Sequence, residues 1–265
     1  MKMMTIASGS SGNCTFVGTD NTSLLVDVGI SKKKIEDGLN SIDLSLKDMD
    51  GILITHEHID HVRAIGVISR KYEIPLYATA DTCYEISHMS ALGDFNKELL
   101  KPINVDETFG IGDIKVEAHS IWHDAADPVC YSLYGDGKKV SIATDMGDYD
   151  DYIVDALKDS DGLLVEANHD VRMLECGSYP YQLKQRILGK RGHLSNEAGG
   201  RLLNLLLNDH VKVSFLGHLS KENNYPELAY ETVKLEIMDN PYTNDIRDFN
   251  LRVAERDRTS ELITF

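Results

Sequence analysis

The chain has 265 residues, 42% of them hydrophobic, so it is long enough to bury a sizeable core. Its 27 basic and 43 acidic residues give a net charge of −16, which argues against nonspecific binding of nucleic acid over the whole surface. No stretch approaches the roughly 20 apolar residues of a membrane helix, and the first apolar run is shorter than the about 7–15 residues of a signal-peptide core. We therefore expect a cytoplasmic protein without membrane contact.

Short runs rich in β-branched and aromatic residues alternate with helical patterns along the chain. The predicted strands lie at 15–18, 23–29, 51–55, 75–79, 114–121, 129–135, 139–145, 162–168, 211–218 and 251–257, and the predicted helices lie near 60–71, 80–90, 150–159, 195–208 and 226–237. No Pro- or Ser-rich linker and no break in composition interrupts the alternation, which predicts one α/β domain over residues 1–265.

Two parts of the sequence resemble each other. The run SLLVDVG (23–29) is similar to VSIATDMG (140–147), and DGILITHEH (50–58) is similar to DGLLVEANH (161–169). Each half is therefore predicted to contain an apolar strand that ends in an acidic residue, then a helix and a second strand. If the halves pack face to face, the polar residues at these strand ends converge on one edge: Asp27, His56, Asp145 and His169.

The sequence HEHIDH (56–61) directly follows an apolar strand. His56 and His58 stand two residues apart at the strand end, where alternate side chains point the same way. Asp60 and His61 then begin a helix, so ligands approach one small volume from both sides. Imidazole and carboxylate suit zinc, manganese or iron, and HxHxDH therefore predicts a metal site. An exposed histidine-rich turn does not explain the buried strand that leads into it.

Further ligands are expected behind other strands, because four ligands from one loop cannot close a two-metal site. His123, Asp145 and His218 each stand where an apolar strand stops. Two divalent ions about 3.5–4 Å apart can share a water and lower its pKa toward roughly 7, which gives hydroxide near neutral pH. Such a site needs no Ser or Cys nucleophile.

An Asp after an early strand, HxHxDH, and then His, Asp and His at later strand ends resemble the metallo-β-lactamase fold hydrolases. The strings ASGSSGN, HDAADPV, TDMG, RGHLSNEAGG and LGHLSKENN are similar to the YycJ/WalJ (VicX) branch of that superfamily, and the resemblance covers essentially the whole chain. It implies an α/β fold with four layers, an αβ/βα sandwich of two facing mixed sheets, with a two-metal site at one edge.

The resemblance also implies a role for each ligand. One metal would be held by His56, His58 and His123, the second by Asp60, His61 and His218, and Asp145 would bridge the two. Asp27 would orient one of these ligands from outside the metal shell. The expected ions are two Zn²⁺ or two Mn²⁺, with iron as a further candidate, because these donors accept several metals.

Candidate substrate contacts lie outside the ligand set. The turn SGSSGN offers Ser10, Ser11, Asn13 and free backbone N–H groups to a phosphate oxygen, although an ordinary hairpin turn has the same composition. His169 lies next to Asp170 in the second half and has either an outer-shell or substrate role or a simple place on the surface.

His193 precedes a predicted helix N-terminus, where an anion is favoured, and it resembles the His of the HST-type motif in tRNA-processing members of the superfamily. We expect Asp60 and His193 to be catalytic, with His193 stabilising the transition state or protonating the leaving oxygen. The alternative for His193 is a capping or packing role.

The resemblance implies a metal-dependent phosphodiesterase, an exonuclease whose substrate is DNA, whereas the residues alone support metal-assisted hydrolysis. The acidic composition speaks against DNA unless basic residues gather near the site. One basic cluster comprises Lys184, Arg186, Lys190 and Arg191, although such clusters are also common on solvated faces. The alternatives are a hydrolase of a small thioester, lactone or cyclic phosphodiester, a di-iron electron-transfer module, and a metal-stabilised scaffold without activity.

Overall fold

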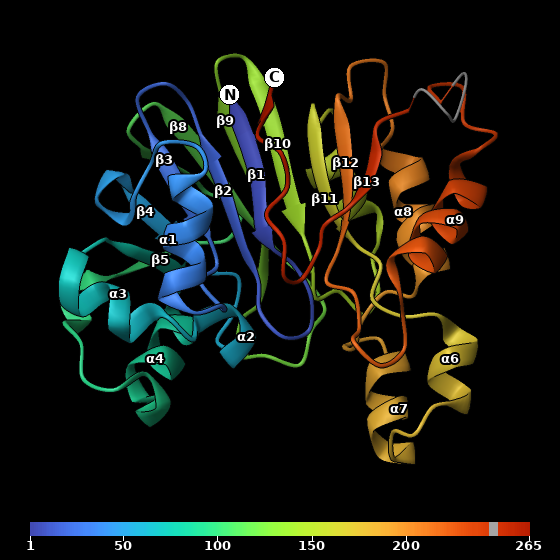
Figure 1. Cartoon of the computed structure of the whole chain (residues 1–265), viewed down its shortest axis with the longest axis horizontal. Coiled ribbons are helices and arrows are strands. Elements are labelled where there is room, and N and C mark those ends of the chain that lie inside the picture. The colour runs from blue at the N-terminus through green and yellow to red at the C-terminus, as the bar shows by residue number, and fades with distance from the viewer. Residues whose placement is uncertain (244–248) are drawn as a thin grey trace.

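Two seven-stranded sheets carry the fold in this computed structural model, which describes residues 1–243 and 249–265 (Figure 1). The first sheet contains, in spatial order, β14 (Ile263–Thr264), β1 (Lys2–Ala7), β2 (Cys14–Gly18), β3 (Ser23–Val26), β4 (Gly51–Leu53), β5 (Leu76–Thr79) and β6 (Leu100–Ile103). The second contains β13 (Leu251–Val253), β12 (Val213–Gly217), β11 (Gly162–Glu166), β10 (Lys138–Ala143), β9 (Val129–Gly135), β8 (Ile114–Ser120) and β7 (Thr108–Ile111). Strands β3 to β6 and β10 to β13 run parallel and the others antiparallel, so both sheets are mixed, as predicted.

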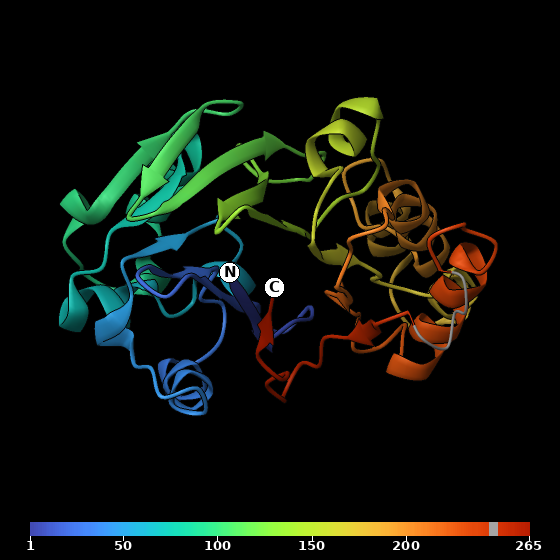
Figure 2. The ribbon, with the colours of Figure 1, turned by 90° about the horizontal axis from the view of Figure 1, so that it is seen from above.

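Helices flank the two sheets. The first half contributes α1 (Lys32–Asn40), α2 (Ile59–Val62), α3 (Ile65–Tyr72), α4 (Ala80–His88) and the short 3₁₀ helices η1 (Leu46–Asp48), η2 (Ser90–Leu92) and η3 (Lys97–Leu99). The second half contributes α5 (Asp151–Leu157), α6 (Val171–Cys176), α7 (Tyr181–Leu188), α8 (Asn196–Leu206) and α9 (Pro226–Ile237). In Figures 1 and 2 the blue helix α1 and the orange helices α8 and α9 lie on opposite sides of the strands. Within the described residues, no helix combines the length and the apolar character that a membrane span requires.

Side-chain alternation along the strands creates three apolar clusters. On β1, Met3 belongs to the cluster between the sheets and Met4 to the cluster under the helices of the first half; Leu24 and Leu25 on β3 divide in the same way. A third cluster joins the second sheet to α5, α8 and α9. Three apolar clusters between four layers of secondary structure confirm the predicted αβ/βα sandwich.

The two halves repeat the same strand arrangement with a different register. In each half an antiparallel strand is followed by a parallel pair, β3 with β4 and β10 with β11. Leu24 lies opposite Gly51, whereas its counterpart Ile142 lies opposite Leu164, which corresponds in sequence to Leu53. The second pair is therefore shifted by two residues relative to the first.

Several elements differ from the prediction. Strands β1, β6, β7 and β14 and helices α1, α6 and α7 were not predicted, since Met-rich β1 lacks the β-branched signal and α1 opens with three lysines. The predicted helix 60–71 is split into α2 and α3, because Ala64 donates its N–H to Val28 O (2.9 Å) instead of continuing the first helix. The predicted strand 23–29 ends early because Asp27 has a left-handed backbone (φ 60°).

Candidate metal centre

The loop between β4 and α2 brings three imidazoles together. The ring centroids of His56 lie 4.6 Å from His58 and 4.2 Å from His61. His56 and His61 are completely buried, and His58 is the last residue before α2. The short distance between strand end and helix start therefore concentrates these side chains at the carboxyl edge of the first sheet.

Main-chain hydrogen bonds hold this loop in place. Asp60 O accepts from Asn13 N and His61 O accepts from Val28 N, both at 2.8 Å, and Gly29 N donates to Asn13 O at 2.8 Å. A Cβ on Gly29 would lie 1.5 Å from the carbonyl oxygen of Asp60, so only glycine fits at this close approach. The ligand loop is thus fixed by neighbouring backbone as well as by its own side chains.

Asp27 fixes the orientation of His61. His61 Nδ1 lies 2.8 Å from Asp27 Oδ2, and Thr55 donates both its N–H and its hydroxyl to the same carboxylate at 2.9 Å. This contact leaves His61 Nε2 facing Asp60 and Asp145, at 3.5 and 3.2 Å. A carboxylate behind an imidazole in this way selects the tautomer and orientation that a metal ligand requires.

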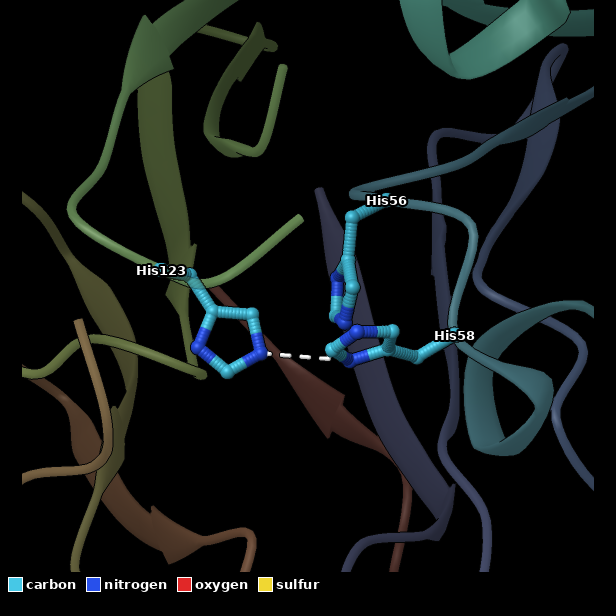
Figure 3. Close-up of side chains that lie close together, drawn as sticks. All are labelled: His56, His58 and His123. Carbon is cyan, nitrogen blue, oxygen red and sulfur yellow. Dashed lines mark hydrogen bonds between the residues drawn. The ribbon is translucent and has the colours of Figure 1, made fainter. Parts of the chain in front are cut away.

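His123 reaches the loop from the second half of the chain (Figure 3). It follows β8, and its Nε2 lies 3.2 Å from His58 Nδ1, with its ring centroid 4.9 Å from that of His56. Its Nδ1 donates to Gly192 O at 3.1 Å. The ligand atoms of His56, His58 and His123 lie within 4.8 Å of one another, close enough to share an ion.

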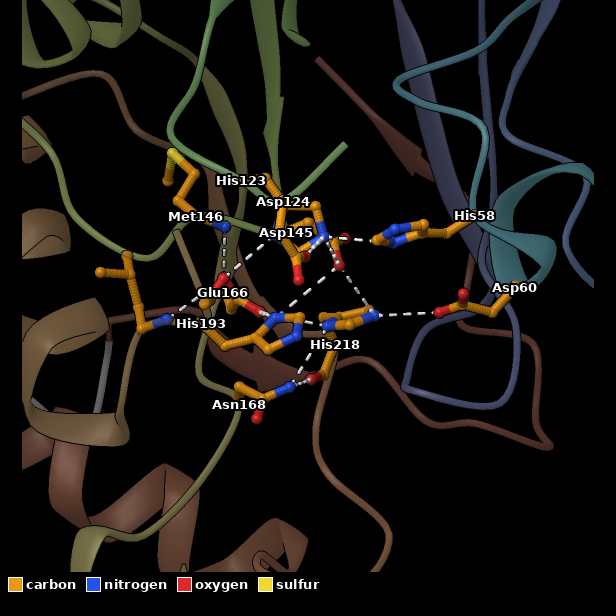
Figure 4. A network of polar contacts seen from close by, with 12 residues as sticks. His58, Asp60, His123, Asp124, Asp145, Met146, Glu166, Asn168, His193 and His218 are labelled. Carbon is orange, nitrogen blue, oxygen red and sulfur yellow. Dashed lines mark hydrogen bonds and ion pairs between the residues drawn. The ribbon is translucent and has the colours of Figure 1, made fainter. Parts of the chain in front are cut away.

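Asp145 and His218 complete the cluster (Figure 4). The carboxylate of Asp145 lies 3.2 Å from His61 Nε2, 3.4 Å from His218 Nε2 and 3.8 Å from His123 Nε2. His218 Nε2 is also 3.4 Å from Asp60 Oδ2. Asp145 and His218 follow β10 and β12 with left-handed backbones (φ 61° and 55°), a conformation that non-glycine residues rarely adopt and that is common at functional sites.

Glu166 is a member of this network that the sequence reasoning missed. It is fully buried at the end of β11, and its Oε1 lies 2.8 Å from His193 Nδ1 and 3.1 Å from His218 Nδ1. Its Oε2 accepts from Met146 N at 2.7 Å and from Leu194 N at 3.3 Å. The sequence did contain a signal for Glu166, because this acidic residue ends the apolar run GLLVE. A buried carboxylate without a partner would be very costly, so an acid in this place is expected to have polar partners nearby.

His193 lies within the cluster and precedes α8, whose N-cap is Ser195. Its ring is 5.1 Å from that of His123 and stacks 5.2 Å from that of His218. Since Glu166 holds Nδ1, the other ring nitrogen of His193 is left for a contact outside this pair.

The tentative substrate contacts lie in different environments. Ser10 and Ser11 are exposed, whereas Asn13 is buried with its Nδ2 only 3.1 Å from His61 Nε2. His169 is 1% exposed, and its Nδ1 lies 3.2 Å from Asn168 Oδ1 while its Nε2 has no hydrogen-bond partner in the described structure. A surface position for His169 is therefore wrong, and burial lowers its pKa to about 4.

Burial and crowded charges shift the pKa values within the cluster. Burial opposes ionisation of Asp145, yet His218 and His61 together hold its pKa well below the usual value. Burial likewise opposes charge on His218, but Asp145 raises the pKa of this imidazole to about 10. Burial lowers the pKa of His56 and of His123, which keeps both neutral. Asp145 and Asp27 likewise raise the pKa of His61 despite its burial. Because metals bind neutral imidazoles, an ion that enters the cluster would displace a proton from His61 and from His218.

The donor set fits a divalent metal ion. Imidazole nitrogen and carboxylate oxygen are the usual ligands of zinc and related metals. His56 Nε2 is buried without a hydrogen-bond partner in the described structure, and coordination to a metal would satisfy it. The overlapping groups of donors that lie within 4.8 Å comprise His56, His58 and His123; His56, His61 and Asp145; Asp60, His61 and His218; and Asp145, Glu166, His193 and His218.

Known proteins are similar to this chain in sequence and in fold. The chain is 43% identical over 232 residues to exodeoxyribonuclease WalJ of Streptococcus pneumoniae serotype 2, covering 88% of this chain and 86% of the relative. It is 39% identical over 228 residues to exodeoxyribonuclease YycJ of Bacillus anthracis, covering 86% of each. The metallo-β-lactamase fold protein YhfI of Bacillus subtilis is similar in fold alone, with 14% identity, a TM-score of 0.69 and coverage of 98% and 100%.

A family model described as the beta-lactamase superfamily domain matches residues 24–218. That range contains every ligand candidate from His56 to His218 and both strand pairs of the internal repeat. The chain therefore belongs to the metallo-β-lactamase superfamily, in the branch that includes WalJ and YycJ.

Proposed function

We propose that this chain is a metal-dependent exodeoxyribonuclease, which hydrolyses phosphodiester bonds from an end of a DNA strand. The observation that carries the proposal is the convergence of imidazoles and carboxylates from both halves on one edge, within 4.8 Å in each group. Metal-assisted hydrolysis follows from these donors. DNA as the substrate follows from relatives that are 39–43% identical over most of their length and are named exodeoxyribonucleases.

Two ions would be held by the predicted ligands, with Zn²⁺ or Mn²⁺ as the preferred metals and iron as a further candidate. His56, His58 and His123 would hold one ion, Asp60, His61 and His218 the other, and Asp145 would contact both. When bound, such ions lower the pKa of a shared water and neutralise charge that develops on the phosphoryl oxygens.

The side chains around the ions have separate tasks in this scheme. Asp27 holds His61 through Nδ1, and Glu166 holds His193 and His218 in the same way. His61 and His218 keep the pKa of Asp60 far below its usual value despite burial, so its ionised carboxylate can orient the attacking water. As the water gives a proton to solvent and its oxygen bonds to phosphorus, the phosphorus–oxygen ester bond breaks and His193 gives a proton to the leaving oxygen.

The test is hydrolysis of end-labelled DNA by the purified chain with Mn²⁺ or Zn²⁺. We expect stepwise release of nucleotides, loss of activity in His58→Ala, and normal activity in the control His88→Ala, which alters an exposed histidine of α4. Turnover of a thioester, lactone or cyclic phosphodiester with no release of nucleotides would contradict the proposal and favour a small-molecule hydrolase. Bound metal without any turnover would indicate a non-catalytic scaffold.

A further inference from the structure

The single tryptophan of the chain, Trp122, is exposed beside the metal cluster. It directly precedes His123, and 43% of its surface is accessible to solvent. Its carbonyl oxygen accepts from Gly147 N at 2.9 Å, which fixes the backbone of this loop. The ammonium of Lys190 lies 5.6 Å from the centre of the indole ring. A half-exposed indole with a cation over its ring suits a flat, apolar ligand group that carries a nearby negative charge, because the group can replace the ammonium on the ring while the ammonium meets the charge.

The segment that contacts the Trp122 loop is basic although the chain as a whole is acidic. Residues 171–193, which contain α6 and α7, include five basic residues and one acidic residue, while the whole chain has 27 basic and 43 acidic residues. The basic residues of this segment are Arg172, Lys184, Arg186, Lys190 and Arg191. In Figure 1, α6 and α7 extend past the strands at the same end of the molecule as α2, which contains Asp60 and His61 of HxHxDH.

Direct contacts join the basic segment to the loop that carries His123. Arg186 binds the carboxylate of Asp124 through two nitrogens, Nε and Nη2, the latter at 3.0 Å. Arg191 Nε donates to His123 O at 2.9 Å. Among the described residues, Lys190 pairs with one carboxylate, Asp148, at the long distance of 3.8 Å, and its side chain is 79% exposed. The cation over the indole is therefore largely free to meet an anion.

We propose that Trp122 and Lys190 bind a single strand of DNA, with one base stacked on the Trp122 indole and the adjoining phosphate on Lys190. This inference rests on the proposed function and adds the form of the substrate. Aromatic faces and cations are the combination by which proteins bind single strands without sequence preference. The bases of a duplex are already stacked on each other, so a base must be unpaired to lie flat on the indole.

The lone tryptophan allows a direct optical test. We expect the fluorescence of the metal-loaded protein to be quenched on titration with a phosphorothioate oligothymidine, which resists hydrolysis, and much less by the same strand within a blunt duplex. Binding is followed independently by the anisotropy of a labelled strand. Saturated binding without a change in Trp122 fluorescence would overturn the inference.

Variants of Trp122 and Lys190 distinguish the contribution of base stacking to strand affinity from the contribution of charge. Trp122→Ala should weaken the anisotropy-measured Kd for the strand about tenfold, and Trp122→Phe should restore most of it. Lys190→Ala should reduce the slope of log Kd against log salt by about 0.7, the value for one phosphate contact in a single strand. The control Lys47→Ala, an exposed lysine of η1, should leave both quantities unchanged. Equal Kd values for Trp122→Ala and the unaltered chain would refute a stacked base.

The outcomes for this surface and for the proposed function are distinct. If the chain degrades DNA but Trp122→Ala and Lys190→Ala bind the strand normally, the surface is wrong and the nuclease function stands. If the strand binds and quenches Trp122 while no metal supports release of nucleotides, the surface is supported and the nuclease function fails. If no strand binds at all, the surface is refuted.

Discussion

The two halves of the molecule contribute to the metal cluster in different ways. The first half provides four candidate ligands in one stretch of six residues, 56–61, held by backbone contacts to the preceding turns. The second half provides its members singly, each from the end of a different strand: His123, Asp145, Glu166 and His218. The first group is recognisable as a local motif, whereas the second becomes a group only when the second sheet forms and packs against the first.

Residues at equivalent positions in the two halves also have different roles. Asp27 and Asp145 follow β3 and β10 with nearly the same left-handed backbone, φ 60° and 61°. Asp27 holds His61 from behind, but Asp145 faces the imidazoles directly. In the second half Glu166 of β11, whose counterpart in the sequence repeat is Thr55, orients His193 and His218.

The largest expected effect is at Asp145. Asp145→Asn keeps the shape of the side chain but removes the charge shared by the two ligand groups, so we expect DNA hydrolysis to fall more than about 10³-fold. Metal analysis after dialysis should show fewer ions per chain. The control Asp155→Asn alters an exposed acid on α5 and should behave like the unaltered protein. Retained activity and metal in Asp145→Asn would mean that the cluster does not depend on its bridging acid.

His193 should matter for rate more than for metal binding. Removal of a general acid typically costs about 10²–10⁴ in rate, and we expect His193→Ala to fall in that range while it retains more metal than Asp145→Asn. Steady-state kinetics with saturating metal, together with metal analysis, checks both statements. Loss of metal equal to that of Asp145→Asn would reassign His193 as a ligand.

The two orienting acids should differ in their response to added metal. We expect Asp27→Asn to lower metal affinity about 10–100-fold, since Asp27 supports His61, and excess metal should restore its rate. Glu166→Gln should lower kcat by about 10–100-fold because it also supports His193, and excess metal should not restore it. Rates measured across a metal titration distinguish the two. Full recovery of both variants would show that the halves do not differ in this respect.

The smallest effect is expected at His169, the counterpart of His58 in the second half. His169 is buried and its pKa is lowered to about 4, so the unfolded chain takes up this proton first as the pH falls. Native stability should therefore be lost between roughly pH 6.5 and 4, by about 2–3 kcal/mol at pH 4.5. Urea unfolding at pH 7 and 4.5 should show a smaller loss in His169→Gln. An identical loss in both proteins would place the acid sensitivity elsewhere.

The same difference between the two halves determined which site residues could be predicted from the sequence. HxHxDH could be recognised because its six residues are contiguous, from the end of β4 to the start of α2. His123, Asp145 and His218 could be recognised because each follows an apolar strand, and strands that run in the same direction end at the same edge of a sheet. Glu166 escaped notice, although an acidic residue closes the apolar run GLLVE, because its partners His193 and His218 come from distant positions in the sequence. Helices α6 and α7 were missed because they bury little apolar surface of their own, with Leu174 and Ile187 as their buried residues.

The backbone hydrogen bonds that Asn13 and Val28 donate to Asp60 and His61 have a consequence for the exchange of ions. A loop whose main chain is already anchored loses little conformational entropy when an ion enters and gains little when it leaves. Chelation should therefore empty the centre and leave the sandwich folded, and a different divalent ion should be able to take the vacated place without refolding of the chain.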